Sequence, residues 1–302
     1  MASFIDFLKI YKLKKSMGWI MSKKIDFLLV SIVILLLCLV IFVGKTVISS
    51  NEAEAELDRK LSVEDEIVAN TSDISGETVD DSDVKIEVVM NKVVCIDPGH
   101  QQKADMSKEP IGPGAKKKKA KVDGGAIGVK SGMTEYQLNL NIALKLQKIL
   151  EDRGYTVVMT RTTNDVNISN SQRAQIANEA SADAFVRIHA DSINSSSVNG
   201  ATTLCQTKNN PYNGALYEQS RSLADCVING LTASAGCKKR STIETDDMSG
   251  INWCQVPTTI VEVGYMSNPR EDGLLATDSY QQLIAEGIAD GIDDYFATDS
   301  NF

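Results

Sequence analysis

The alternation of short apolar runs with amphipathic segments is the feature of this sequence that most restricts its fold. It begins past Val84 and continues almost to the carboxyl end. The apolar runs predict strands over residues 92–96, 155–160, 184–189, 200–207 and 257–263. The amphipathic segments predict helices over residues 134–153, 171–181, 211–235 and 279–296. Because strands separated by helices need crossover connections, the sequence predicts an α/β domain over residues 91–298, with a twisted, mostly parallel sheet flanked by helices.

The helix predicted over residues 134–153 carries a carboxylate that faces inward. Thr134 and Gln137 stand at capping-box spacing at its start, and Gly154 predicts its end. Counted from Glu135, apolar residues follow the i+3/i+4 stripe of a core-facing helix surface: Leu138, Ile142, Leu146 and Ile149. A first-turn acid ordinarily complements the helix dipole, but an unpaired buried charge is strongly unfavourable. Glu135 therefore needs a partner inside the domain.

The first 90 residues differ in character from this domain. Residues 1–26 carry six lysines against two aspartates, and residues 27–44 form an 18-residue stretch without a charge. A helix of that length covers about 27 Å, close to the ~30 Å hydrocarbon core of a bilayer. Residues 45–90 form an acidic linker without aromatic residues. The positive-inside bias predicts a membrane anchor with the linker and the domain outside; a cleaved secretory signal, the alternative, exports the same part.

Only two histidines occur in the whole chain, so a histidine-dependent site has almost no choice of residues. Both stand at predicted strand ends: His100 after VVCIDPG and His189 at the end of AFVRIH. Glu262 lies within the apolar run TTIVEVG, where a lone carboxylate also needs a partner. Ligands bind beyond the carboxyl ends of strands in open α/β sheets. Two imidazoles and one carboxylate leave an open position on Zn²⁺, and a second carboxylate can move a proton, so this set with Glu135 predicts a metal hydrolase.

Four ordered blocks of the domain resemble the zinc-dependent N-acetylmuramoyl-L-alanine amidases of the Amidase_3 type. They are CIDPGHQ, TEYQLNLNIALKL, SQRAQIANEASADAFVRIHAD and TTIVEVGYMSNPRED, and the resemblance covers about residues 92–296. It implies a twisted, mostly parallel sheet, a Zn²⁺ ion held by His100, Glu135 and His189, and Glu262 as the acid/base residue. It also implies the bond that is cut, the amide joining the lactyl group of N-acetylmuramic acid to L-alanine in peptidoglycan.

The segment between the first two implied ligands departs most from the usual pattern of that family. Residues 101–134 are 34 residues rich in lysine and glycine, in place of a short glycine-rich segment. We expect them to form a mobile loop that borders the cleft as a lid or a plug, or that folds away from it. The lysines of residues 116–121 are expected to be solvated, with contact to anionic wall polymers as the alternative. Asp191 adds a negative charge where a neutral amide is usual, and Arg173 is expected on a helix surface, or else holding a substrate carboxylate.

The favoured function is a peptidoglycan hydrolase anchored in the cell membrane, or secreted if the first segment is cleaved. One alternative keeps the metal chemistry but cuts a peptide–peptide amide, as a wall endopeptidase or carboxypeptidase. The other is a catalytically silent wall-binding domain, which the presence of all four site residues disfavours. The expected partners are peptidoglycan and the membrane, with a regulatory protein partner left open. Nucleic acid is excluded, because a net charge of −9 lacks the basic face that such binding requires.

Overall fold

The computed structural model of this chain describes residues 92–299. The chain divides into two units, residues 1–78 and 79–302, and the first lies wholly outside the described residues. The predicted anchor over residues 27–44 and the acidic linker over residues 45–90 also lie outside them. Among residues 92–299, no helix combines the length and the apolar character that crossing a bilayer requires.

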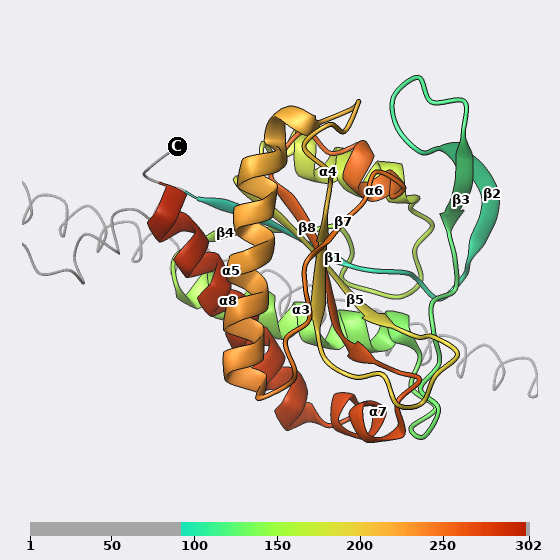
Figure 1. The fold of residues 1–302 in the computed structure, drawn as a ribbon, viewed down its shortest axis with the longest axis vertical. Helices are drawn as coiled ribbons and strands as arrows, with labels where there is room; N and C mark the ends of the chain where they lie inside the picture. Colours follow the sequence, from blue (N-terminus) through green and yellow to red (C-terminus); the bar gives the residue numbers. More distant parts are fainter. Residues whose placement is uncertain (1–91, 300–302) are drawn as a thin grey trace, which may run out of the picture. The chain divides into compact units, whose positions relative to one another are not determined.

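A six-stranded sheet forms the centre of the described domain, in the order β4-β1-β5-β8-β6-β7 (Figure 1). The strands are β1 (Val93–Pro98), β4 (Thr156–Met159), β5 (Ala184–Asp191), β6 (Thr202–Cys205), β7 (Ile243–Glu244) and β8 (Thr258–Tyr265). Neighbours are parallel except β6, which runs antiparallel to β8 because no crossover helix lies between β5 and β6. This confirms the predicted, mostly parallel α/β sheet. The register sets Asp97 opposite Arg187 and His189 opposite Glu262.

Helices cover both faces of the sheet. They are α3 (Glu135–Asp152), α4 (Asn170–Glu179), α5 (Tyr217–Ala235), α6 (Ser249–Asn252), α7 (Pro269–Leu275) and α8 (Asp278–Asp299). On one face, α3, α5 and α8 bury the larger apolar cluster together with β1, β5 and β8 (Figure 1). On the other face, α4 and the residues around α6 enclose a smaller cluster that includes Phe185 and Trp253. The sheet is therefore buried on both sides, which leaves its carboxyl edge as the place for a site.

The start of α3 differs from the predicted one. Thr134 is the N-cap residue, but its side chain accepts no backbone N–H, so the expected capping box is absent. Gln137, its expected partner, instead donates to Asn141 and accepts a hydrogen bond from Asn164, a residue that lies beyond β4. A tertiary contact has thus replaced the local one. The helix stops before Gly154 as predicted, and the φ of 89° at this glycine suits a residue without a side chain.

The second long helix also begins later than predicted. α5 starts at Tyr217, after a 3-10 turn over Gly214–Leu216, rather than at residue 211. The Asn210 carboxamide accepts the N–H groups of Tyr212 and of the residue after it, and this holds the chain in a turn before the helix.

Residues 101–134, expected to be a mobile loop, contain a second, two-stranded sheet. Its antiparallel strands are β2 (Asp105–Pro110) and β3 (Lys118–Val122). The hairpin is fixed to α4 and α6: Glu109 accepts the N–H and the hydroxyl of Ser171, and the Trp253 indole donates to a carbonyl oxygen at the end of β2. The sequence did not reveal these strands because Val122 is their one buried apolar side chain, and the other buried side chain, Glu109, finds its partner on a distant segment.

Candidate active site

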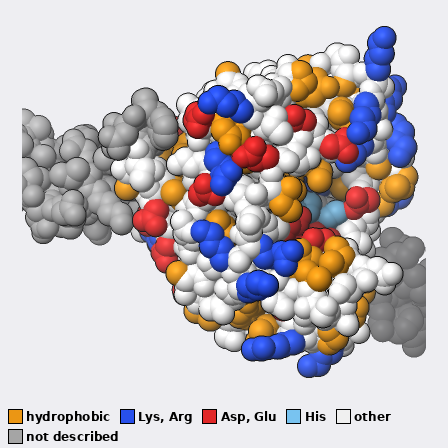
Figure 2. All heavy atoms as spheres, viewed as in Figure 1, with side chains coloured by type: hydrophobic (Ala, Val, Ile, Leu, Met, Phe, Trp, Pro, Cys, Tyr) orange, Lys and Arg blue, Asp and Glu red, His pale blue; other side chains and the backbone are white. Residues whose placement is uncertain are grey.

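The carboxyl ends of β1, β5 and β8 and the start of α3 meet at one edge of the sheet. His100 lies just beyond β1, His189 and Glu262 lie in β5 and β8, and Glu135 is the first residue of α3. All four line one cleft, and Figure 2 shows the histidine rings in it with acidic side chains beside them. The structure therefore brings together every residue that the sequence assigned to the site.

Three of these residues turn donor atoms toward one point. His100 Nε2 lies 3.0 Å from Glu135 Oε1, and His189 Nδ1 lies 3.2 Å from each of these two atoms. The three side chains can each offer one donor so that all lie within 4.8 Å of one another. Two imidazole nitrogens and a carboxylate oxygen are a donor set that suits Zn²⁺ and leaves a further position open.

The Glu135 carboxylate is held by groups from both sides of the cleft. Oε1 accepts the N–H of Ala190 at 3.1 Å, and Oε2 accepts the N–H of Ala126 at 2.8 Å. Asn139, one turn along α3, donates to Oε1 at 3.4 Å. Burial acts to raise the pKa of Glu135, but hydrogen bonds and the charges of the two histidines outweigh it and lower the pKa well below its usual range. The inward-facing acid that the helix stripe predicted therefore has its partners and stays ionised.

His100 is oriented by its backbone and by Asp123. Its φ of 59° is left-handed, a strained conformation that persists in a non-glycine residue only where the surroundings impose it. Its Nδ1 lies 2.8 Å from Asp123 Oδ1, which leaves Nε2 facing the centre of the site. Burial acts to lower the pKa of His100, but the carboxylates of Asp123 and Glu135 outweigh it and raise the pKa to about 10. A carboxylate behind a histidine in this way fixes the ring and its tautomer.

Two glycines make room for the donors. A Cβ atom on Gly99 would lie 2.3 Å from two ring atoms of His189. Gly125 has a φ of 70°, and a Cβ atom there would come within 2.9 Å of Glu135 and His100 atoms. Any side chain at either position would therefore displace a donor.

Below the site, the buried Asp97 joins the strands that carry the two histidines. Asp97 accepts hydrogen bonds from Arg173 at 2.7 Å, Arg187 at 2.9 Å and Thr160 at 2.5 Å. Arg173 also donates to the carbonyl oxygen of His100 at 2.9 Å. This corrects the expectation for Arg173, which is fully buried and is neither on the helix surface nor open to a substrate. Burial acts to raise the pKa of Asp97, but the two guanidinium charges hold it well below its usual range.

Glu262 faces the same cleft from β8. Its Oε2 is enclosed and has no hydrogen-bond partner among the described residues. Burial raises its pKa well above the usual range, and the charges of Glu135 and Asp191 add to this. Together with Asp123, four carboxylates line the cleft, and no lysine or arginine of residues 92–299 lines it. Such a concentration of carboxyl groups without a lysine or arginine, next to a convergent His/Glu/His donor set, fits a bound Zn²⁺ ion.

The inserted segment borders this cleft only with its second half. Asp123, Gly125 and Ala126 line the cleft, whereas the hairpin before them is fixed against α4 and α6. Asp191 also lines the cleft, and its Oδ1 accepts the N–H of Ser192 at 2.7 Å. The part of the insertion that follows β3 therefore supplies one wall of the site.

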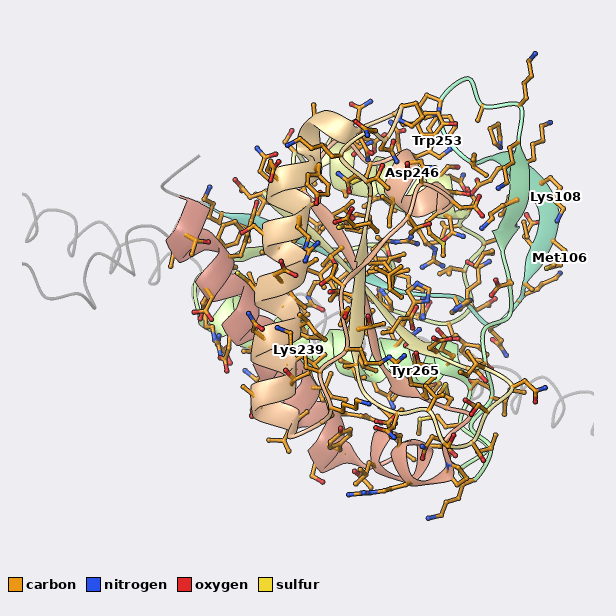
Figure 3. All side chains as sticks on the ribbon, in the orientation of Figure 1. Met106, Lys108, Lys239, Asp246, Trp253 and Tyr265 are labelled. Atoms are coloured by element: carbon orange, nitrogen blue, oxygen red, sulfur yellow. The ribbon has the colours of Figure 1, made fainter. Side chains whose placement is uncertain are left out.

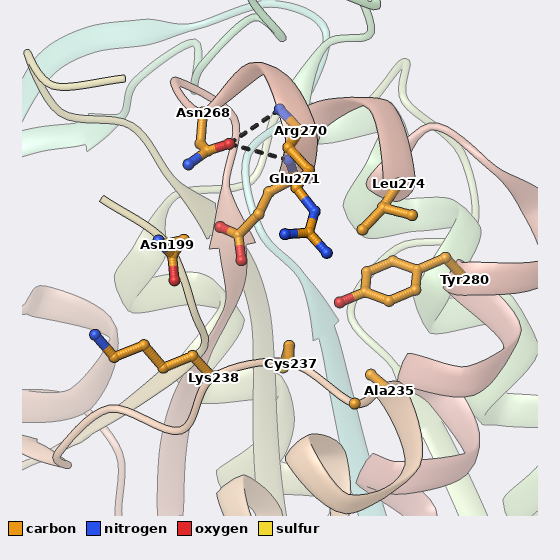
Figure 4. A pocket seen from close by; sticks show the side chains of 10 residues that line it. Asn199, Ala235, Cys237, Lys238, Asn268, Arg270, Glu271, Leu274 and Tyr280 are labelled. Atoms are coloured by element: carbon orange, nitrogen blue, oxygen red, sulfur yellow. Dashed lines mark hydrogen bonds between the residues drawn. The ribbon is translucent and has the colours of Figure 1, made fainter. Parts of the chain in front are cut away.

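A second pocket lies apart from these residues, between α7 and the carboxyl end of α5 (Figure 4). Its lining includes Arg270 and Glu271 but none of the four predicted site residues. Glu271 accepts the N–H of Gly200 at 2.7 Å and that of Tyr265 at 2.9 Å, so it ties the chain before β6 to the end of β8. Glu271, the acidic residue of this pocket, therefore stabilises the fold.

The sequence did not predict two residues of the site, Asp123 and Asp97. A signal for Asp123 existed, since it precedes two glycines directly after the run of residues 116–122. Asp97 stands in the block CIDPGHQ that carries His100, but its partners Arg173 and Arg187 lie 76 and 90 residues away in sequence. No local pattern connects such residues.

Comparisons with known proteins agree with this geometry. Residues 94–294 match the family model of N-acetylmuramoyl-L-alanine amidase, Amidase_3. The N-acetylmuramoyl-L-alanine amidase LytC of Bacillus subtilis (strain 168) is 30% identical over 230 residues, which are 76% of this chain and 40% of LytC. This chain therefore spans less than half the length of that curated relative.

Two solved structures share the fold. The amidase Ami1 from Mycobacterium smegmatis is 25% identical, with a TM-score of 0.64, and the match covers 70% of this chain and 99% of that one. The catalytic domain of CwlV, an amidase from Bacillus (Paenibacillus) polymyxa var. colistinus, is 31% identical, with a TM-score of 0.55 and coverage of 68% and 98%. Both matches cover nearly all of the solved chain.

Proposed function

The chain belongs to the N-acetylmuramoyl-L-alanine amidase family, and from this premise we propose that it is a zinc-dependent peptidoglycan hydrolase. The bond cut is the amide between the lactyl group of N-acetylmuramic acid and the L-alanine of the stem peptide. The observation that carries the proposal is the convergence of donors from His100, Glu135 and His189 in the cleft that Glu262 also lines.

In this proposal His100, Glu135 and His189 hold the metal ion. Zn²⁺ supplies a Lewis acid that polarises the scissile carbonyl group and strengthens water as a nucleophile near neutral pH. Asp123 keeps a proton on His100 Nδ1, so a bound metal ion would take the place of the proton on Nε2. Asp97 and its two arginines hold the strands of the two histidines in register, which fixes the donors before any substrate arrives.

Glu262 moves the proton in this proposal. Its carboxyl group accepts a proton from the attacking water and delivers it to the nitrogen of the departing L-alanine. Two features support this role: Oε2 has no competing partner among the described residues, and burial raises the pKa of the carboxyl group well above its usual range, which favours its protonated form. The raised pKa helps the group keep the proton taken from water until the leaving nitrogen accepts it.

We propose the layout of the whole chain from the charge pattern. Residues 1–26 are cytoplasmic, residues 27–44 cross the membrane, residues 45–90 form the tether and residues 91–298 act outside. A regulatory protein partner remains a prediction. The layout is tested by protease treatment of intact cells: digestion of the domain with survival of the amino end supports it, and full protection of the domain contradicts it.

The amide specificity is tested by digesting purified cell wall with the full chain in a neutral detergent. New amino termini are labelled and identified. Free L-alanine amino groups support the amidase, whereas any other new terminus supports the endopeptidase or carboxypeptidase alternative. The Glu262→Gln variant serves as the matched control, because it keeps the shape of the side chain. Absence of any new terminus with zinc-loaded protein would support the silent wall-binding domain instead.

A further inference from the structure

The hairpin of β2 and β3 has a charge opposite to that of the chain. Residues 101–122 contain seven lysines against two acids, a net charge of +5 in a chain whose net charge is −9. Figure 2 shows one group of basic side chains at the upper right edge, in the region where Figure 1 places β2 and β3. A positively charged region on a negatively charged protein needs a physical explanation.

Three of these seven lysines are paired with carboxylates and are not free to bind a partner. Lys117 and Lys119 lie 2.6 and 3.0 Å from the carboxylate of Asp247, and Lys121 lies 3.5 Å from that of Asp105. The other four have exposed side chains and no acidic partner among the described residues: Lys103, Lys108, Lys116 and Lys118. The surplus positive charge therefore rests on these four.

Strand geometry places Lys108 and Lys118 on the face opposite to the paired Glu109 and Lys119. Glu109 and Lys119 are opposite one another in the register, and both bind groups outside the hairpin. Lys108 and Lys118 are their sequence neighbours, so they point to the other face of the strands. Figure 3 shows Lys108 and Met106 directed away from the domain. The outward face is therefore basic, and the acids of the hairpin do not neutralise it.

The composition of this face selects the kind of partner. Protein interfaces are centred on buried aromatic or aliphatic anchors, and here Met106, 60% exposed, is the one large apolar side chain of residues 101–122 that is exposed. Lysine carries a point charge on a flexible side chain, whereas the planar guanidinium group of arginine binds a single anion in a fixed bidentate geometry. Lysines also protect edge strands from pairing, but mixed charges achieve this without a field of one sign. The face therefore suits a flexible polymer with repeated phosphate groups.

We propose that Lys103, Lys108, Lys116 and Lys118 bind a polyol-phosphate polymer of the cell wall and so hold the cleft beside its substrate. This rests on the proposed function, because it places the enzyme where such polymers and peptidoglycan occur together. The hairpin begins five residues after His100, and β3 ends one residue before Asp123. The end of β3 therefore lies next to the cleft, so a polymer bound to the hairpin is held on the same part of the domain as the hydrolytic site.

The test measures binding of the full chain, in a neutral detergent, to soluble poly(glycerol phosphate) at several salt concentrations. The variant replaces the four lysines by glutamine. We expect its affinity at 0.1 M salt to fall at least about tenfold, and the slope of log K against log[salt] to fall by about 3, from ~0.7 for each phosphate contact on a single strand. A control variant with the same change in net charge replaces Lys130, Lys148, Lys208 and Lys239, four exposed lysines outside the hairpin, of which Lys148 and Lys208 are ion-paired.

The control variant separates a local site from total charge. Loss of affinity in the hairpin variant alone supports the proposal; equal loss in both variants, or in neither, overturns it. Binding to vesicles of anionic lipid without binding to the polymer also overturns it, because the occupant is then a membrane surface. Hydrolysis of wall stripped of its phosphate polymers is measured in parallel and should be equal in the two variants. If no protein hydrolyses that wall, the proposed function fails while the binding result stands by itself.

Discussion

Replacing Asp97 by asparagine tests whether the buried ion network supports the site. Asp97 has no solvent exposure and binds Arg173 and Arg187, which are themselves buried. Asparagine keeps nearly the same shape and removes the charge. Two guanidinium groups then remain buried without a compensating carboxylate.

Removing one partner from a buried ion pair usually destabilises a protein by about 3–5 kcal/mol, because the remaining charge is left without compensation. A domain of this size loses roughly 2–4 °C in Tm for each kcal/mol, so we expect a fall of about 6–20 °C. Chemical and thermal denaturation of the metal-free protein measure this directly. The exposed pair Lys148–Asp152 supplies the control, since Asp152→Asn is expected to leave the midpoint unchanged.

The difference in unfolding free energy between wild type and Asp97→Asn depends on pH with a definite sign. Despite burial, Arg173 and Arg187 hold the pKa of Asp97 below its unfolded value of about 3.9. The stabilisation is therefore fully present above the unfolded pKa and is lost as pH falls through the folded one. The gap between wild type and Asp97→Asn should be constant from about pH 8 to pH 5 and should shrink below about pH 4. A gap under about 1 kcal/mol, or one that widens on acidification, would refute the reasoning.

Four further changes probe the cleft. Glu262→Gln should retain zinc, measured by metal analysis, while hydrolysis falls ~10²–10⁴-fold; near-normal activity would assign the proton transfer elsewhere. His100→Ala should lose stoichiometric zinc, since the chain's other histidine, His189, is already in the donor set and none is left to replace His100. Asp123→Asn should weaken zinc binding roughly 10–100-fold in a competition titration with a chelator, and unchanged affinity would deny it the orienting role. Gly99→Ala should displace the His189 ring and weaken zinc binding with little change in the Tm of the metal-free protein, because the ring can swing aside.

Local patterns in the sequence determined the main elements and the four site residues. Strand and helix periodicities depend on neighbours within a few residues, so β1, β5, β8 and α3 were predictable from apolar spacing alone. The same local logic placed His100, His189 and Glu262 at or near strand ends and set Glu135 on the inner face of its helix. Because parallel strands end at a common edge, these local facts sufficed to predict that the four side chains meet.

Only the tertiary structure decided how that edge is built. Asp97 pairs with Arg173 and Arg187, which lie 76 and 90 positions away in the sequence. Because these buried residues are charged, no apolar periodicity in the sequence marks them as part of the core. The hairpin formed from a lysine-rich segment because Glu109 and Lys119 found partners on distant parts of the chain, not because its own residues favour strands. Asp123 reached His100 by the same folding of the insertion. Contacts of this kind depend on which surfaces the packed sheet brings together, and that is a property of the whole domain rather than of any window of its sequence.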